Sequence, residues 1–354
     1  ADFRSHVLGG FIEPLLGGHD AKAVEIFCYS QGIADDAVTR RCRAQADHWR
    51  DIAGKDDAAV AEMIRADGLH VLEDLSCHTA GNRLGVFARK PAPVQVTHIG
   101  AFATTGLDSM DYWITDGVLH PPDTAELAAE AIWRLRRCWV GWRPPADAPD
   151  IAPPPSLSGR PVTFGSFNNL AKLTPRTIAL WSRVLAALPG SRLLLKDRKL
   201  QEAAERNRLH QAFAAHGIAP GRLEMKAYVA SAKAHLELYN DMDLALDPVP
   251  CTGAGTTVEA LWMGVPVVTL AGSVMLERQG ASLLAAIGRG EWITGSEDGY
   301  VALALSLAHD GTARAALRAS QRGRMAASEL CDERGFAAAV EAAYRTMWEK
   351  ARRQ

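Results

Sequence analysis

The stretch Asp243–Ser273 constrains the fold of this chain more than any other segment. It holds a short apolar run, Leu244–Leu246, followed by two prolines and a loop of small residues, Thr252–Thr257. Residues Val258–Met263 predict a helix that stops at a glycine, and a second apolar run, Pro266–Leu270, follows at once. Prolines break regular elements, and short apolar runs are typical of buried parallel strands. The pattern therefore predicts strand, loop, helix and strand, which is the repeating unit of an α/β fold.

The loop Thr252–Thr257 leads into a helix N-terminus, where free backbone N–H groups and the helix dipole favour an anion. Gly253 lets a phosphate approach the backbone, and Thr256 and Thr257 add hydroxyl donors. Glu259, in the first turns of the helix, can accept both hydroxyls of a ribose. No Gly-Lys-Ser/Thr follows, so the loop is not a Walker motif. When the loop is considered alone, an ordinary turn between a strand and a helix explains its sequence about as well as a phosphate-binding site does.

Strands that alternate with helices are expected along most of the chain, which indicates a parallel sheet with helices on both faces. The other expected strands are Val24–Tyr29, Leu69–Leu75, Val94–Ile99, Tyr112–Thr115, Val162–Phe167, Arg192–Lys196 and Arg222–Ala227. The other expected helices are Asp56–Ala66, Pro175–Leu188, Gln201–His216 and Ala232–Asn240, and residues 298–350 are expected to be mostly helical.

One shift in composition divides the chain. Residues 143–161 are rich in proline, which favours a stiff, extended connector. We therefore expect an N-terminal domain over residues 1–142, a second domain over residues 162–335 and a C-terminal helix over residues 336–354. An α/β domain usually opens with a strand, and no strand pattern precedes Asp2. The first domain is therefore expected to lack its first strand, and the chain to be a piece of a longer one.

The composition argues against several classes of protein. The 354 residues are 48% hydrophobic and 23% charged, which is a globular composition long enough for two domains. The net charge of −2 gives no reason to expect nucleic acid or an anionic membrane as a partner, and no apolar run approaches transmembrane length. The six cysteines are scattered without a Cys-x-x-Cys pair. Neither a zinc site nor a disulfide framework is therefore expected, and a reducing cytoplasm fits best.

Polar residues, Asn168, Asn169 and Lys172, directly follow the strand expected over Val162–Phe167. Ligands of open parallel sheets bind outside the carboxyl ends of the strands. Lys172 and the loop Thr252–Thr257 would then line one side of a cleft between the domains, and the turns after the strands at 69–75 and 94–99 would line the other. A lysine there can neutralise a diphosphate leaving group. A solvated surface lysine is the alternative, and the position favours the functional role.

Four histidines are candidates for chemistry. His6 stands just before a Gly-Gly pair and is expected in a loop, where it could act as an acid, a base or an orienting group. His78 is on a turn, whereas His70 lies inside an expected strand and should point into the core. His235 precedes the central stretch on a helix, where it could touch a bound base or lie on the surface.

Asp241 and Asp243 have the spacing of the Asp-x-Asp metal motif of some sugar transferases. Asp243 begins an expected strand and is far from the carboxyl end of that strand, where a metal in the cleft would bind. We therefore expect a mechanism without a metal and without a cofactor.

Several long stretches together resemble one family. They read DFRSH (2–6), HTAGNRLGVFARKPAPVQV (78–96), MDYWITD (110–116), VTFGSFNNLAKLTP (162–175) and ALDPVPCTGAGTTVEALWMGVPVVTLAGS (245–273). They resemble the catalytic region of protein O-GlcNAc transferases and of plant SPINDLY-type protein O-fucosyltransferases, and are closer to SPINDLY and its bacterial relatives. The resemblance implies an α/β fold of the GT-B type, with two Rossmann-like domains facing a central cleft. It also implies inverting, metal-independent sugar transfer, and tetratricopeptide repeats upstream in a longer parent chain.

The resemblance also implies roles for single residues. His6 matches the active-site histidine, and Lys172 matches the lysine that meets the donor diphosphate. The implied donor-nucleotide residues are Asn169, His235, Gly253, Thr256, Thr257 and Glu259, of which Glu259 binds the ribose and His235 lies near the base. The implied sugar and acceptor residues are His78, Thr79, Gly100 and Cys251.

The chain departs from the family pattern at three places, one of which is Cys77, where the family has a glycine before the His-Thr pair. Ala101 and Phe102 replace a Tyr-Pro pair near the donor sugar, and Ala254 and Gly255 break a run of threonines. The expected function is transfer of GlcNAc from UDP-GlcNAc to Ser or Thr hydroxyls of cytoplasmic proteins. Two alternatives stay open because of the departures: the same fold with GDP-fucose or UDP-glucose as donor, and a nucleotide-binding module without catalysis.

Overall fold

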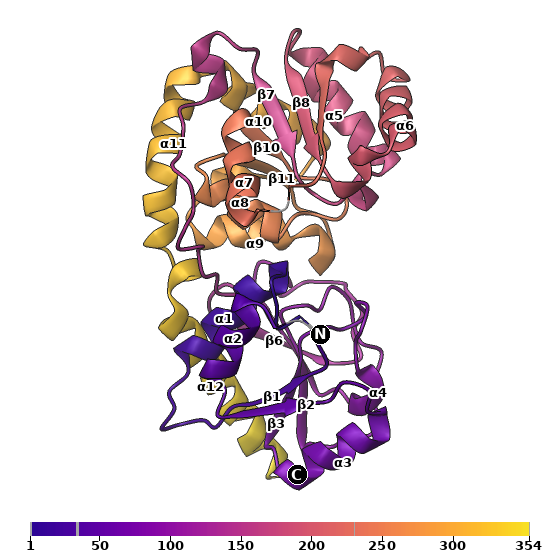
Figure 1. Ribbon diagram of the computed structural model, residues 1–354, viewed down its shortest axis with the longest axis vertical. Helices are drawn as coiled ribbons and strands as arrows, with labels where there is room; N and C mark the ends of the chain where they lie inside the picture. Colours follow the sequence, from indigo (N-terminus) through magenta and orange to yellow (C-terminus); the bar gives the residue numbers. More distant parts are fainter. Residues whose placement is uncertain (1, 33–34, 230, 354) are drawn as a thin grey trace. The chain divides into compact units, whose positions relative to one another are not determined.

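The computed structural model describes residues 2–32, 35–229 and 231–353. The chain divides into two compact units (Figure 1). Unit 1 comprises residues 1–143 together with residues 329–354, and unit 2 comprises residues 144–328. The C-terminal segment thus belongs to unit 1, although the sequence had indicated a second domain that extends to residue 335. Among the described residues, no helix is long and apolar enough to cross a membrane.

Unit 2 contains a parallel sheet of order β12-β11-β10-β7-β8-β9. Its strands are β7 (Thr163–Ser166), β8 (Arg192–Lys196), β9 (Leu223–Lys226), β10 (Leu244–Leu246), β11 (Val267–Leu270) and β12 (Ile293–Thr294). The chain runs from β7 outward through β8 and β9, and then returns to place β10 on the other side of β7. The strand order therefore reverses between β7 and β10, and this switch point is where ligands of open α/β sheets bind.

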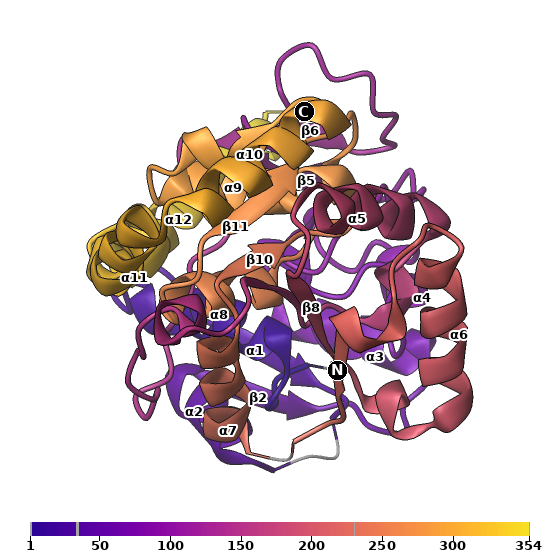
Figure 2. The same cartoon turned by 90° about the horizontal axis from the view of Figure 1, so that it is seen from above.

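Helices cover both faces of this sheet. They are α5 (Pro175–Ala187), α6 (Ala203–Ala214), α7 (Ala232–Glu237), α8 (Gly255–Trp262), α9 (Gln279–Ala286), α10 (Glu297–His309) and α11 (Gly311–Ala326). Short 3₁₀ turns are η1 (Pro155–Ser158), η2 (Leu170–Lys172), η3 (Arg198–Gln201), η4 (Pro220–Arg222), η5 (Leu238–Asp241), η6 (Met275–Glu277) and η7 (Gly290–Trp292). Figure 2 shows α5 and α8 on opposite sides of β8 and β10.

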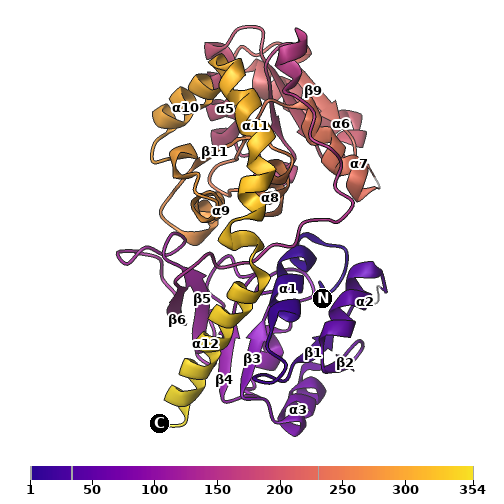
Figure 3. The ribbon, with the colours of Figure 1, turned by 90° about the vertical axis from the view of Figure 1, so that its left-hand side faces the viewer.

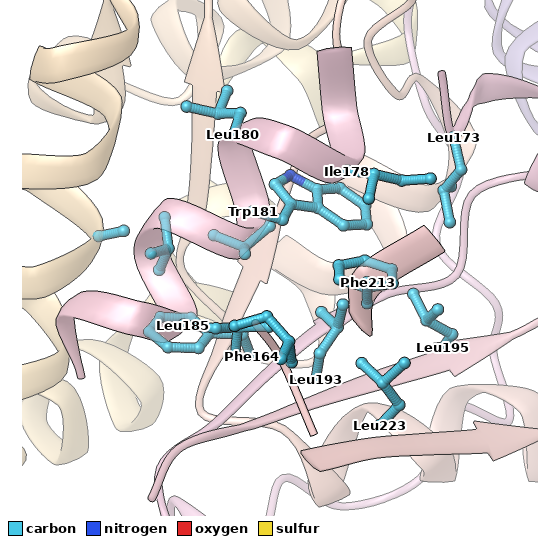
Figure 4. Close-up of a cluster of buried hydrophobic side chains, with 14 of the residues drawn as sticks. Phe164, Leu173, Ile178, Leu180, Trp181, Leu185, Leu193, Leu195, Phe213 and Leu223 are labelled. Carbon is cyan, nitrogen blue, oxygen red and sulfur yellow. The ribbon is translucent and has the colours of Figure 1, made fainter. Parts of the chain in front are cut away.

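The core of unit 2 lies between the sheet and the helices α5, α6 and α10 (Figure 4). Phe164 on β7, Trp181 on α5 and Phe213 on α6 are all fully buried there. The indole N–H of Trp181 donates to the hydroxyl of Tyr300 on α10 over 3.2 Å, and that hydroxyl donates to the carbonyl of Asp247 over 2.9 Å. The core thus fixes the backbone at the residue that follows β10.

Unit 1 contains two separate parallel sheets, β1-β2 and β3-β4-β5-β6. The strands are β1 (Phe27–Ser30), β2 (His48–Asp51), β3 (Val71–Asp74), β4 (Val94–Thr97), β5 (Tyr112–Asp116) and β6 (Ala131–Leu135). The helices are α1 (Val7–Gly18), α2 (Ala37–Gln45), α3 (Asp57–Asp67), α4 (Leu84–Phe87) and α12 (Glu333–Ala351), and η8 (Glu329–Cys331) precedes α12.

The C-terminal helix α12 packs against α1 (Figure 3). His19 Nδ1, just after α1, lies 2.9 Å from the carboxylate of Glu341, and the Tyr344 hydroxyl donates to Glu73 on β3. Phe336 and Met347 are fully buried on the same helix. The last helix of the chain is therefore a structural part of unit 1.

The structure corrects two sequence expectations about glycine-rich segments. The Gly9-Gly10 pair lies inside α1, and His6 is the residue that caps this helix. A side chain at Gly9 would approach Arg4 O to 2.6 Å, so close packing explains this glycine. Helix α8 begins at Gly255, so Thr256 and Thr257 belong to its first turn and not to the preceding loop.

Candidate functional site

The loops that follow β7 and β10 meet at the switch point of unit 2. The ammonium of Lys172 donates to the carbonyl of Thr252 over 2.7 Å and lies 3.4 Å from Asn168 Oδ1. The same amide oxygen accepts a 3.0 Å hydrogen bond from the hydroxyl of Thr256. Lys172 is half-buried and Asn168 is buried. The lysine expected from the sequence is therefore joined directly to the loop expected to bind phosphate.

The N-terminus of α8 has no side-chain cap, because Ala254 stands at the cap position. The buried hydroxyl of Thr257, in its first turn, has no hydrogen-bond partner within the described part of the chain. A Cβ at Gly253 would lie 2.6 Å from this hydroxyl oxygen and 2.8 Å from that of Thr256, so only glycine fits. An uncapped helix N-terminus with an unused buried donor is a suitable site for an anion such as phosphate.

A buried carboxylate, Asp247, holds this loop in place. Its Oδ1 accepts the Gly253 N–H over 2.8 Å, and its Oδ2 accepts the Thr269 hydroxyl over 2.8 Å. Burial raises the pKa of Asp247 from 3.8 to about 6, although both hydrogen bonds and the charge of Lys172 act in the opposite direction. Asp247 was not among the residues selected from the sequence. Its position directly after a buried strand is the sequence signal that could have identified it as a site residue, because ligands bind at the carboxyl ends of parallel strands.

Glu259 lies at the centre of a second polar cluster. Its Oε2 is 3.0 Å from His235 Nε2 and accepts a 3.0 Å hydrogen bond from the Tyr239 hydroxyl. His235 Nδ1 lies 3.0 Å from the ammonium of Lys196. A carboxylate only accepts and an ammonium only donates, so this pattern requires the neutral imidazole with its proton on Nε2.

The surroundings of this cluster are partly apolar. The ring of Phe167, directly after β7, lies 5.7 Å from that of His235 and 4.6 Å from that of Tyr239. Burial lowers the pKa of Lys196, while the charge of Glu259 acts to raise it. Burial and the neighbouring Glu259 raise the pKa of the Tyr239 hydroxyl well above its usual value. An aromatic surface beside a carboxylate and a histidine can contact a nucleoside.

The candidate residues of unit 1 gather at the carboxyl ends of β3 and β4. A ring nitrogen of the exposed His78 lies 2.9 Å from the carbonyl oxygen of Thr104. Thr79 donates its hydroxyl to Ser76 O over 2.6 Å, and a side chain at Gly100 would overlap the carbonyl of Leu75. Both contacts tighten the turn after β3.

His6 caps α1, where its Nδ1 accepts from the N–H of Leu8 over 3.3 Å. Its side chain is 40% exposed and lies 3.8 Å from the carboxylate of Asp2. The imidazole is thus held loosely at a helix N-terminus, with Nε2 available to a ligand.

Two expected residues do not join the cluster in unit 2. Asn169 is exposed and accepts from the N–H of Ala171 at the start of η2, so the neighbouring Asn168 contacts Lys172 in its place. Cys251 is half-buried beside the loop. Three further residues of the unit 2 site were not selected from the sequence. Lys196 and Tyr239 belong to the cluster around Glu259, and Asp247 holds the loop at Gly253.

Asp241 and Asp243 have structural partners. Asp241 accepts from Lys226 over 2.6 Å. Asp243, at the amino end of β10, accepts from the hydroxyl of Ser156 over 2.6 Å and from the backbone N–H of Thr163 over 2.8 Å. Among the described residues, no group of three His, Cys, Asp or Glu side chains could hold a metal ion.

The fold and the site together define a class of protein. Two α/β units with parallel sheets, and a lysine, a Gly/Thr loop and a carboxylate at the switch point of the second, are the arrangement of a GT-B glycosyltransferase. A solved structure of Anabaena HepE in complex with UDP shares this fold, with a TM-score of 0.57 at 12% identity over 98% of both chains.

The chain belongs to glycosyl transferase family 41, which matches residues 1–140 and 156–340. It is 42% identical over 353 residues to the probable UDP-N-acetylglucosamine–peptide N-acetylglucosaminyltransferase SPINDLY of Arabidopsis thaliana. The match covers 99% of this chain and 39% of that protein. Identity to the probable enzyme of the same activity named SEC, also from Arabidopsis thaliana, is 30%.

A solved mutant of the Thermobaculum terrenum O-GlcNAc transferase has a TM-score of 0.94 at 42% identity. That match covers 99% of this chain and 66% of the solved chain. The resemblance and the GT-B fold expected from the sequence are therefore confirmed. The chain spans about two fifths of the length of the curated relatives, 39% for the SPINDLY protein of Arabidopsis thaliana and 38% for that of rice.

Proposed function

We propose that this chain is the catalytic region of a protein O-glycosyltransferase that transfers a single GlcNAc from UDP-GlcNAc to Ser or Thr hydroxyls. The carrying observation is the contact of Lys172 with the loop that leads into the uncapped N-terminus of α8. The names of the relatives, which include peptide N-acetylglucosaminyltransferases of plants and a bacterial O-GlcNAc transferase, support the choice of donor and acceptor.

The main chemical demand of this reaction is the charge that develops on the leaving diphosphate. Lys172 would turn from the carbonyl of Thr252 to the diphosphate, and the first turn of α8 would add its N–H groups and the hydroxyls of Thr256 and Thr257. Donors that are already in place stabilise such charge at low reorganisation cost. The side-chain oxygen of Asn168 contacts both Lys172 and Thr256, so Asn168 would orient these two diphosphate-binding groups.

We assign the nucleoside to the second cluster. Glu259 would accept the ribose hydroxyls, and His235 and Phe167 would contact the base. Asn169 remains a proposed neighbour of the donor nucleotide, and Cys251 remains a proposed residue of the sugar and acceptor pocket.

The residues of unit 1 are assigned to the acceptor and the sugar. His6 would orient the acceptor hydroxyl or help to remove its proton, and His78, Thr79 and Gly100 would shape the surrounding turns. The acceptor oxygen attacks the anomeric carbon in line as the nucleoside diphosphate leaves on the opposite face, so the configuration inverts.

The wider setting is also part of the proposal. The scattered cysteines favour a cytoplasmic protein. Acceptor proteins would be recognised by tetratricopeptide repeats in a longer parent chain. No metal ion and no cofactor would be needed.

The test is a transfer assay with unstructured Ser/Thr-rich peptides and three donors: UDP-GlcNAc, GDP-fucose and UDP-glucose. Mass spectrometry reads the added sugar, and calorimetry with UDP and GDP reads the base preference. Transfer of GlcNAc with tighter binding of UDP supports the proposal. Transfer of fucose or glucose would replace the donor assignment. Nucleotide binding without any transfer would instead identify a binding module.

A further inference from the structure

Lys196 stands at the carboxyl end of β8, the strand that pairs with β7 in the sheet of unit 2. Ligands of open parallel sheets bind at this edge. The ammonium of Lys196 lies 3.0 Å from His235 Nδ1, in the cluster that also contains Glu259. The lysine is therefore a side chain of the site to which the nucleoside is assigned.

Both ring nitrogens of His235 are engaged inside this cluster. Nδ1 accepts from the ammonium of Lys196, and Nε2 donates to the carboxylate of Glu259, over 3.0 Å in each case. The imidazole can therefore offer a nucleobase its ring face but no free nitrogen. Recognition of the polar edge of the base has to come from another group.

The ammonium of Lys196 has donors to spare. It carries three N–H groups, of which His235 takes one. Burial lowers the pKa of Lys196, while the charges of Glu259 and Asp197 act to raise it. Within the described part of the chain, neither carboxylate is close enough to form an ion pair with the ammonium, and Glu259 pairs with His235 instead. A half-buried ammonium without an ion pair gains from any further acceptor that a ligand brings.

Aromatic rings lie beside this cluster. The ring of Phe167 lies 5.7 Å from that of His235, and the centroid of the exposed Tyr228 ring, shortly after β9, lies 5.6 Å from the ammonium of Lys196. Every base can stack on an aromatic ring, so stacking supplies affinity with little discrimination. The choice between bases therefore needs a polar group at the edge of the base.

A lysine reads the edge of a base through donors alone. Uracil carries the carbonyl oxygen O4 where cytosine carries an amino group, and guanine carries O6 where adenine carries an amino group. An ammonium can donate to either oxygen. Opposite an amino group, it would set two donors against each other and leave both without a partner, which is costly in a partly buried site.

We propose that Lys196 sets the base specificity of the donor site. Its ammonium keeps one N–H on His235 Nδ1 and donates another to O4 of uracil or O6 of guanine, so that donors with cytosine or adenine are disfavoured. The contact with His235 holds the ammonium in place before the nucleotide arrives. This inference rests on the proposed function, because it places the nucleoside at the cluster around Glu259.

The test is calorimetric titration with two pairs of nucleotides, UDP with CDP and GDP with ADP. The members of each pair share the ribose and the diphosphate and differ only in the base. Lys196→Met removes the donor and keeps the length of the side chain. Lys196→Gln supplies an amide oxygen that can accept from an amino group. Arg198→Met is the matched control, because Arg198 is exposed and its guanidinium lies 5.1 Å from the centroid of the same Tyr228 ring.

We expect the wild type to bind UDP about 10–100-fold more tightly than CDP, or GDP more tightly than ADP by a similar factor, because one charge-assisted hydrogen bond separates the two members. The pair that shows this preference identifies the base of the donor. In Lys196→Met the ratio should fall to about three-fold or less, because stacking alone hardly distinguishes the bases. It should also fall in Lys196→Gln, which decides the test if Lys196→Met does not fold. Arg198→Met should keep the ratio of the wild type.

A ratio that stays at its wild-type value in the Lys196 variants would overturn this inference, even if all affinities fall together, because a purely structural role weakens every nucleotide alike. Equal binding of both members of each pair by the wild type, or loss of the preference in Arg198→Met alone, would overturn it as well. These results would leave the proposed function in place, since the nucleotide still binds. A wild-type chain that binds no nucleotide would overturn the inference and the proposed donor site together.

Discussion

Replacing Asp247 with asparagine should make the stability of unit 2 less dependent on pH. Burial raises the pKa of this carboxyl from 3.8 to about 6 in the folded chain. Asparagine preserves the shape of the side chain, since its oxygen can accept from Gly253 and its amide can donate to Thr269. The substitution therefore removes the titration and keeps both contacts.

The sign follows from proton binding. The folded state binds the proton of Asp247 more tightly than the unfolded state, so protonation favours folding. The contribution is fully present below about pH 4 and is lost as the pH rises through about 6. The change of the Asp247 pKa from 3.8 to about 6 corresponds to about 3 kcal/mol of unfolding free energy in total, of which about two thirds falls between pH 4.5 and 7.5.

Urea unfolding of the wild type and of Asp247→Asn at pH 4.5 and 7.5 measures this contribution. The difference in unfolding free energy between the two proteins should change by about 2 kcal/mol between these pH values, in favour of the variant at pH 7.5. Asp298→Asn is the matched control, because it removes the same charge from a side chain that is 90% exposed. A difference that stays constant with pH would refute the argument from burial.

The remaining predictions concern the donor site. Lys172→Ala should lower the transfer rate about 10²–10³-fold while the fold is kept. Substitution of the exposed Lys199 with alanine is the control and should leave the transfer rate unchanged. Wild-type turnover in Lys172→Ala would remove Lys172 from the mechanism. Glu259→Gln should weaken binding of UDP and of the sugar donor by similar factors and should mainly raise KM, because each charge-assisted bond to a ribose hydroxyl contributes about 1.5–3 kcal/mol in ground and transition states alike. Tyr239→Phe removes the hydroxyl that donates to Glu259 and, over 3.3 Å, to the carbonyl of Thr256, and should have a smaller effect in the same calorimetric titrations. Unchanged affinity in Glu259→Gln would exclude Glu259 from the ribose site. Transfer should continue in EDTA, and loss of activity that Mn²⁺ or Mg²⁺ restores would return Asp241 and Asp243 to consideration.

The sequence predicted best the elements that the sheet of unit 2 buries on both faces. The strands at 192–196 and 244–246 have the predicted bounds, because continuous apolar runs have little alternative to a central parallel strand. The order of strands and loops also placed Lys172 and Thr256 on the same edge of that sheet, where they share a contact with Asn168.

Other features could not be predicted because they depend on packing between distant segments. Helix α1 contains a Gly-Gly pair and a proline, and both residue types disfavour a helix when only the local sequence is considered. Packing overrides this preference, because Gly10 lies against the indole of Trp142. Of two adjacent asparagines, only the path of the backbone decides that Asn168 faces inward and Asn169 outward. Lys196 resembles an exposed strand end, yet it reaches His235, which lies 39 residues further along the chain.

The discontinuity of unit 1 determines how this protein can be recombined. Unit 2 is inserted between residues 143 and 329 of unit 1, so it is bounded by two junctions rather than one. A chimera that takes everything after residue 143 from a relative would replace α12 as well, and would set a foreign helix against α1 and Glu73. Exchanging only residues 144–328 leaves the native partners of α12 intact. Unit 2 can therefore be exchanged as a single block, and the corresponding unit of a relative could be placed between the same two junctions.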